Sequence, residues 1–77
     1  MLRMAETVLD LIGLKCPLPV LRTGKALKAL PVGDVLVVSA SDPLAAVDIP
    51  NLVRETGDRL IGQERADEVL TFTILRA

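Results

Sequence analysis

The sequence contains no histidine, one cysteine and one aromatic residue, Phe72. A single cysteine cannot form an intrachain disulfide, and without histidine one chain cannot build a Cys/His zinc cluster or a Cys–His catalytic pair. The shortage of aromatic rings removes the stacking platforms on which single-stranded nucleic acids are bound. We expect no metal site and no cofactor, and the functional interpretation centres on the one sulfur nucleophile, Cys16.

The chain also lacks long hydrophobic runs. Its first residues have neither the apolar core nor the small-residue cleavage site of a signal peptide, and no segment is long enough to span a membrane. A lone thiol suits a reducing compartment, so we expect a cytoplasmic protein that does not bind membranes. The 77 residues are too few for two cores, which predicts a flexible N-terminus at 1–6 and a single domain over 7–77.

Hydrophobic periodicity predicts six elements. Residues 7–12 form a strand closed by Gly13, and a helix with its basic residues on one face follows from Pro17 or Pro19 to Leu30. Residues 35–40 are typical of a central strand, 42–56 form a second helical segment with Gly57 as its C-cap, and 58–65 with 69–76 form a hairpin. The order β-α-β-α-β-β predicts an α/β (α+β) two-layer sandwich, a mixed four-stranded sheet with two helices on one face.

The sequence also predicts how several single residues within these elements are placed. The alternation around Phe72 places that ring in the core, and the uncovered sheet face predicts that Leu36 or Val38 points outward. The missing side chain of Gly24 would let the first helix lie close to the sheet. Pro50 should kink the second helix or make it restart with Asp48 as a new cap; the alternative is that Asp48 lies near Cys16.

Cys16 falls where a strand ends and a helix begins. A thiolate there would be favoured by the helix dipole and by the neighbouring Lys15, which predicts a lowered pKa. The shift should be modest, since Pro17 and Pro19 each remove a backbone donor. The helix start stays open, because Pro17 suits the first helical position while Pro19 disfavours a helical Leu18. The structural alternative for Cys16 is a small buried hydrophobe.

Positive charge is concentrated around this cysteine although the net charge is −1. The segment 11–33 contains four basic residues and no acidic one. Such a stripe could attract an acidic partner surface or a phosphate-bearing substrate, and the alternative is an ordinary solvated helix face. The four residues are Lys15, Arg22, Lys25 and Lys28.

Two motifs resemble those of the TusA/SirA-like sulfurtransferase family. The first is Cys16-Pro17-Leu18-Pro19, and the second comprises Asp42-Pro43 with Asp48-Ile49-Pro50. The likeness extends roughly from residue 8 to residue 76, with a departure at Gly24, where relatives often carry a basic residue. It implies the same β-α-β-α-β-β fold and a functional place for Asp48 beside the sulfur.

The resemblance also implies an activity. Cys16 would accept sulfane sulfur as a persulfide from a cysteine desulfurase or another donor protein and pass it to a downstream acceptor. Relatives serve tRNA thiolation, molybdenum cofactor synthesis or sulfur oxidation. The supporting or partner-docking residues would be Lys15, Pro17, Pro19, Arg22, Lys25, Lys28 and Asp48.

A non-catalytic binding or regulatory module with an inert Cys16 is the alternative. The basic stripe would then bind nucleic acid or a protein, but the scarcity of aromatics and the slightly negative net charge argue against nucleic acid, and no direct DNA binding is expected. A peroxide-sensing thiol is a weaker third hypothesis, because the chain has no second cysteine to resolve a sulfenic acid.

Overall fold

The computed structural model describes residues 6–77 and has the predicted order β-α-β-α-β-β. The expectation of a flexible segment at 1–6 lies outside these residues except for Glu6, which is the first residue of a strand. The elements are β1 (Glu6–Leu11), α1 (Leu18–Ala29), β2 (Val35–Ala40), α2 (Ala45–Thr56), β3 (Arg59–Ala66) and β4 (Val69–Leu75).

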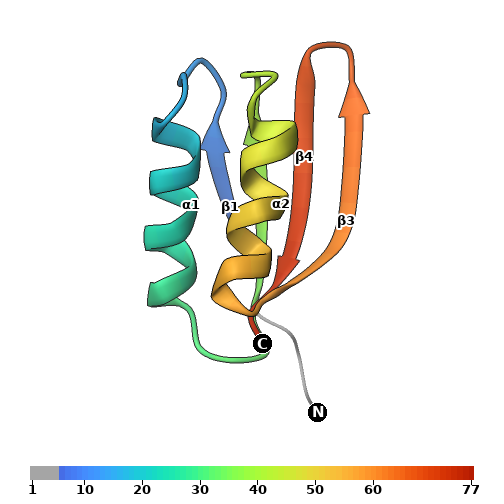
Figure 1. Cartoon of the computed structure of the whole chain (residues 1–77). Helices are drawn as coiled ribbons and strands as arrows, with labels where there is room; N and C mark the ends of the chain where they lie inside the picture. Colours follow the sequence, from blue (N-terminus) through green and yellow to red (C-terminus); the bar gives the residue numbers. More distant parts are fainter. Residues whose placement is uncertain (1–5) are drawn as a thin grey trace.

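The four strands form one mixed sheet in the order β1-β2-β4-β3, and both helices cover the same face of it (Figure 1). β1 pairs with β2 in parallel, whereas β4 is antiparallel to both of its neighbours. Leu11 is the register partner of Ala40, so β1 and β2 end side by side. The predicted two-layer architecture is confirmed, and the loops that follow β1 and β2 meet at one edge of the sheet.

The core lies between the helices and one face of the sheet. Phe72 is completely buried, as predicted. The expectation that Leu36 or Val38 points outward is wrong, because both are fully buried. Successive side chains of a strand alternate between faces, so both even-numbered residues turn toward the helices. The outer face receives Val37 and its register partner Val8, which is 68% exposed.

α1 begins between the two predicted starts. Its first residue is Leu18 and its N-cap is Pro17, which follows a cis peptide bond. Gly24 does not face the sheet as expected, because a Cβ added there would lie 3.7 Å from Leu52 Cδ1 on α2. The buried residues of α1 are Pro19, Thr23 and Leu27, whereas Gly24 is turned toward the second helix.

α2 is one uninterrupted helix, so the predicted restart at Asp48 is wrong. The Asp48 N–H already donates to the Leu44 carbonyl at 2.9 Å, which places Asp48 inside the helix rather than at its cap. Pro50 lies in the first half of α2, where its missing N–H removes a single helical hydrogen bond. The predicted C-cap is confirmed: Gly57 adopts a left-handed conformation with φ of 79°.

The buried carboxylate of Asp58 binds the last residues of the chain. It lies at the end of the molecule opposite to the loops that follow β1 and β2. The Asp58 side chain is fully buried, and it accepts hydrogen bonds from Arg76 Nη1 at 3.1 Å and from the Ala77 N–H at 3.0 Å. The Thr56 hydroxyl donates to the other carboxylate oxygen of Asp58, Oδ2, at 2.7 Å. Burial acts to raise the pKa of Asp58, but these hydrogen bonds and the Arg76 charge hold that pKa below its usual value.

We predict that Asp58→Asn lowers the free energy of unfolding by about 2 kcal/mol at neutral pH, because Arg76 loses its buried partner. A lowered folded-state pKa means that Asp58 stabilises the protein above its unfolded-state pKa, and that this contribution is lost as the pH falls through the folded-state pKa. Urea denaturation over a pH series should therefore show less acid sensitivity in the variant. Glu64→Gln, at an exposed position of β3, is the control; an unchanged acid sensitivity in Asp58→Asn would contradict the prediction.

Candidate functional site

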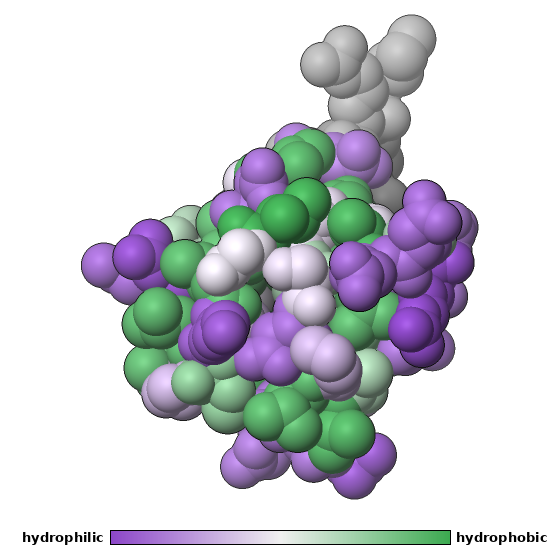
Figure 2. Space-filling model, turned by 90° about the horizontal axis from the view of Figure 1, so that it is seen from above, coloured by the Kyte–Doolittle hydropathy of each residue, from purple (hydrophilic) through white to green (hydrophobic). Residues whose placement is uncertain are grey.

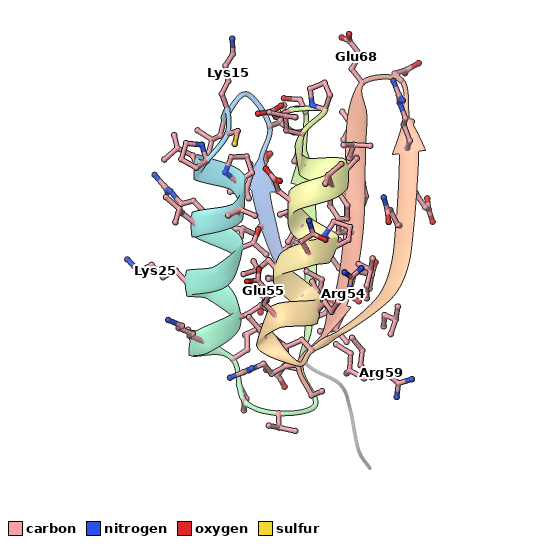
Figure 3. All side chains as sticks on the ribbon, viewed as in Figure 1. Lys15, Lys25, Arg54, Glu55, Arg59 and Glu68 are labelled. Carbon is pink, nitrogen blue, oxygen red and sulfur yellow. The ribbon has the colours of Figure 1, made fainter. Side chains whose placement is uncertain are left out.

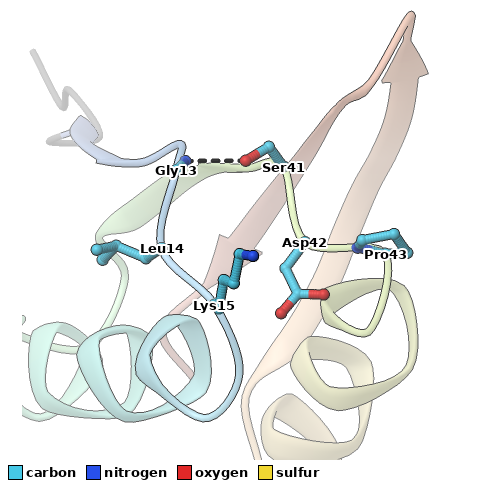
Figure 4. Close-up of a pocket in the computed structure, with 6 residues that line it drawn as sticks. All are labelled: Gly13, Leu14, Lys15, Ser41, Asp42 and Pro43. Atoms are coloured by element: carbon cyan, nitrogen blue, oxygen red, sulfur yellow. Dashed lines mark hydrogen bonds between the residues drawn. The ribbon is translucent and has the colours of Figure 1, made fainter.

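Cys16 lies in the loop that joins β1 to α1, at the carboxyl end of β1, and its side chain is exposed. The buried-hydrophobe alternative is therefore wrong. This loop is tied to the loop after β2, because the Gly13 N–H donates to Ser41 Oγ at 2.8 Å (Figure 4). The position of the cysteine loop is thus fixed by a hydrogen bond to the adjoining loop.

Asp42 holds the backbone of the cysteine directly. The Cys16 N–H donates to Asp42 Oδ2 at 2.6 Å, and the Leu44 N–H donates to Asp42 Oδ1 at 3.0 Å. These two hydrogen bonds, in that order, and then the charge of Lys15 lower the pKa of the Asp42 carboxyl. Asp42 therefore remains ionised while it connects the cysteine loop to the start of α2.

Sequence reasoning did not include Ser41 or Asp42 among the site residues. A signal for them existed in the predicted topology, because neighbouring parallel strands end at the same edge of a sheet and the segment after 35–40 must then adjoin the segment after 7–12. The pairing of Gly13 with Ser41 and of Cys16 with Asp42 depends on side-chain placement, which that argument does not provide.

The thiol itself faces a second carboxylate. Cys16 Sγ lies 3.5 Å from Asp48 Oδ2, so the thiol donates a hydrogen bond to the first turn of α2. This contact brings together two residues that the sequence analysis singled out, and it favours the alternative in which Asp48 lies beside the sulfur over the alternative in which it caps a helix.

The prediction of a lowered thiol pKa is wrong. Partial desolvation of the sulfur, the hydrogen bond to Asp48 and the negative charges of Asp48 and then Asp42 all raise the pKa of Cys16. A protein carboxylate so close to the sulfur penalises the thiolate and favours the neutral thiol. The reduced site is therefore held mainly as a thiol at neutral pH.

No backbone N–H at the start of α1 lowers the pKa of the thiol, contrary to the expected helix-dipole effect. The Leu18 N–H donates to the Lys15 carbonyl at 2.9 Å, and the Leu21 N–H donates to the Pro17 carbonyl at 3.1 Å. Pro17 and Pro19 have no N–H to offer. The Lys15 side chain extends from the loop into solvent (Figure 3), and it does not contribute to the shift of the thiol pKa.

The other basic residues lie along the exposed surface of α1. Arg22 and Lys25 line a shallow depression of about 490 Å³ with Leu18 and Leu21, next to the cysteine loop. Lys28 is in the last turn of the helix, away from the sulfur. Of the two prolines beside the cysteine, Pro17 is exposed and Pro19 is buried.

Exposed hydrophobic side chains occur at the same end of the molecule as Cys16. Viewed from above, this end has hydrophobic patches separated by hydrophilic ones (Figure 2). Such a mixed surface is suited to protein contact, since large exposed side chains can be buried there while the intervening polar groups remain solvated. The exposed residues at this end include Ile12, Leu18, Leu21, Leu44 and Val47.

Within residues 6–77 no three or more Cys, Asp or Glu side chains are grouped so that they could hold a metal ion. The helices of the described part of the chain are all too short or too polar to span a membrane.

The family follows from comparison with known proteins. The family model described as Sulfurtransferase TusA matches residues 7–76, which is nearly the whole chain. The chain belongs to the TusA family. The resemblance noted in the sequence is thereby confirmed, and sulfur transfer is the general activity of this group, which involves a protein that supplies the sulfur and another that receives it.

Individual relatives agree with this assignment. A candidate sulfur carrier protein of Neisseria meningitidis is 44% identical over 71 residues, which cover 92% of this chain and 96% of the relative. The sulfur carrier protein TusA of Allochromatium vinosum is 38% identical over 69 residues, with 90% and 91% covered. The crystal structure of a SirA-like protein from Desulfitobacterium hafniense superposes with a TM-score of 0.77 at 26% identity, covering 90% of this chain and 95% of the other.

We predict that Asp48→Asn moves the ionisation of the Cys16 thiol to lower pH, because it removes a negative charge 3.5 Å from the sulfur. The measurement is the pH dependence of the rate at which iodoacetamide alkylates Cys16, the one cysteine of the chain. Glu55→Gln, a neutralisation further along the same helix, should leave the profile unchanged. Coincident profiles for Asp48→Asn and the wild type would show that Asp48 does not control the thiol.

Proposed function

We propose that this TusA-family protein carries sulfane sulfur as a persulfide on Cys16, taking it from a donor protein and passing it to an acceptor. The observation that supports the proposal is the placement of Cys16. Its thiol is exposed, its backbone is held by Asp42, and its proton is directed at the Asp48 carboxylate. A side chain that must exchange sulfur with two different proteins has to be accessible and firmly mounted.

The transfer needs no cofactor. The Cys16 sulfur attacks the terminal sulfur of the donor's cysteine persulfide, a new S–S bond forms on Cys16, and the S–S bond of the donor breaks. The thiol proton passes to Asp48 as the attack proceeds and then to the departing donor thiolate. One thiol and one persulfide are consumed and one of each is produced, so no external oxidant or reductant is required.

The raised pKa of Cys16 is consistent with such a carrier. A thiol that stays protonated in isolation reacts slowly with oxidants and alkylating agents. The adjacent Asp48 can accept the proton once a donor persulfide is docked, which provides general-base assistance at the moment of attack. The site would then be unreactive when free and become reactive in the complex with its donor.

We further propose a cysteine desulfurase as donor and a second protein, in a route such as tRNA thiolation, molybdenum cofactor synthesis or sulfur oxidation, as acceptor. Two basic residues of α1 support docking, because Arg22 and Lys25 line the depression next to the cysteine loop and α1 has no acidic residue. Complementary charge accelerates the encounter of two proteins and fixes their orientation.

Intact mass measurement tests the persulfide directly. After incubation with a cysteine desulfurase and cysteine, the wild type should gain the mass of one sulfur atom, and a reductant should remove it. Cys16→Ser should gain nothing while keeping the fold, because the side chain is exposed and its backbone hydrogen bonds do not involve the sulfur. A sulfur gain in Cys16→Ser would place the carrier site elsewhere.

The absence of any gain in the wild type would overturn the proposed function, provided that loading from thiosulfate with a sulfurtransferase also fails. Circular dichroism of Cys16→Ser supplies the control for folding, since an unfolded variant would indicate a structural role for the cysteine.

Charge reversal tests the docking role of α1. Arg22→Glu with Lys25→Glu should slow sulfur loading by about tenfold at low ionic strength, and the difference should shrink as salt is added. The matched control is Arg54→Glu with Arg59→Glu, which changes the net charge equally on the side of the molecule away from α1 (Figure 3). Equal slowing by both double variants would assign the effect to net charge rather than to α1.

A further inference from the structure

The carboxylate that faces the Cys16 thiol would also face a sulfur atom loaded onto it. Asp48 is half-buried in the first turn of α2, and its Oδ2 lies 3.5 Å from Cys16 Sγ. An S–S bond is about 2 Å long, so a terminal sulfur bonded to Sγ in its present position lies at most about 5.5 Å from Oδ2. Whichever way that sulfur turns, it stays within the range of about 4–6 Å over which a nearby charge shifts an ionisation.

The cysteine loop has little freedom to withdraw the sulfur from this carboxylate. The Cys16 N–H donates to Asp42 Oδ2 at 2.6 Å, and the Gly13 N–H donates to Ser41 Oγ at 2.8 Å. Both hydrogen bonds tie the loop to the segment that leads into α2, the helix that contains Asp48. The Asp42 carboxylate also adds a second negative charge near the sulfur.

The basic residues near the loop do not offset the two carboxylates. Lys15 extends into solvent (Figure 3), and Arg22 and Lys25 line the neighbouring depression on α1. None of the three contributes to the shift of the thiol pKa. Within residues 6–77 no N–H group donates a hydrogen bond to Cys16 Sγ. The immediate surroundings of the sulfur are therefore negatively charged.

The two states of a sulfur carrier differ in charge. The unloaded Cys16 thiol is neutral and donates its proton to Asp48, a contact that the negative charge of the carboxylate strengthens. A persulfide is a stronger acid than the corresponding thiol, so a loaded Cys16 is an anion at neutral pH. That anion has no proton to donate, and its charge has the same sign as that of Asp48. Loading therefore replaces an attractive contact by a repulsive one.

We propose that Asp48 makes Cys16 hold sulfane sulfur weakly, so that the loaded carrier favours transfer over retention. The inference rests on the proposed function and adds a thermodynamic role at the same site. During loading Asp48 accepts the thiol proton, and afterwards it destabilises the persulfide that has formed.

Exchange with a small thiol shows the effect without any partner protein. The Cys16 sulfur bonds to the terminal sulfur of the small persulfide, the S–S bond of that persulfide breaks, and the thiol proton of Cys16 ends on the departing sulfur. One neutral thiol and one persulfide anion are present on each side, so neither an oxidant nor a reductant is needed. Asp48 stabilises the Cys16 thiol and destabilises the Cys16 persulfide, which displaces this equilibrium away from the loaded protein.

The experiment measures the exchange equilibrium for the wild type and for Asp48→Asn. Each protein is incubated with a fixed ratio of glutathione persulfide to glutathione until the loaded fraction, measured by intact mass, is the same from either direction. At neutral pH we expect the loading equilibrium constant of Asp48→Asn to be about tenfold larger, because a like charge at this distance shifts an ionisation by about one unit. Circular dichroism checks that the variant is folded.

The pH dependence distinguishes charge repulsion from a structural effect. At acid pH the persulfide is protonated and neutral, so the ratio of the two equilibrium constants should fall toward one. Glu55→Gln, which removes a charge further along α2, should match the wild type throughout. An unchanged equilibrium in Asp48→Asn, an equal change in Glu55→Gln, or a tenfold ratio that persists at acid pH would overturn the proposal.

Small persulfides load Cys16 without a donor protein, which separates this proposal from the proposed function. A wild type that is loaded by a cysteine desulfurase, with an exchange equilibrium that Asp48→Asn does not alter, would overturn the role of Asp48 and leave the carrier function standing. A wild type that no donor protein loads, with the expected shift in Asp48→Asn, would support the role of Asp48 and overturn the carrier function. A wild type that takes no sulfur even from glutathione persulfide would overturn both.

Discussion

The parallel pairing of β1 with β2 is the constraint on which the candidate site depends. Because Leu11 is opposite Ala40, the two strands end together, and the loops that leave them are close enough for the Gly13–Ser41 and Cys16–Asp42 hydrogen bonds. A parallel pair requires a crossover connection, and α1 provides it. The cysteine loop, the crossover helix and the start of α2 are therefore all positioned by one strand pairing.

The net effect of the groups around the Cys16 sulfur is to raise its pKa. A helix N-terminus and a neighbouring lysine favour a thiolate in principle, but the Leu18 and Leu21 N–H groups donate to carbonyls and Lys15 extends into solvent. Partial desolvation of the sulfur, then the hydrogen bond to Asp48 and the charges of Asp48 and Asp42, raise the pKa of Cys16. Under the proposed function, the protonated thiol protects the free carrier, and its reactivity is expressed in the complex with a donor.

The buried Asp58 network and the exposed groups suited to protein contact lie at opposite ends of the molecule. The Asp58 network closes the end opposite to the cysteine, where it ties the C-terminal residues to the loop after α2. The cysteine end has exposed hydrophobic side chains and basic residues of α1.

The sequence by itself determined the order of the elements, the buried position of Phe72, the C-cap at Gly57 and the family, because periodicity, capping and short motifs act between neighbours in the chain. Only the tertiary structure decided the surroundings of the sulfur. Asp42 and Asp48 contact Cys16 across 26 and 32 residues, and the side toward which Gly24 faces depends on how α1 packs on α2. Local patterns contain no distance between such residues, so the direction of the thiol pKa shift could not be obtained from them.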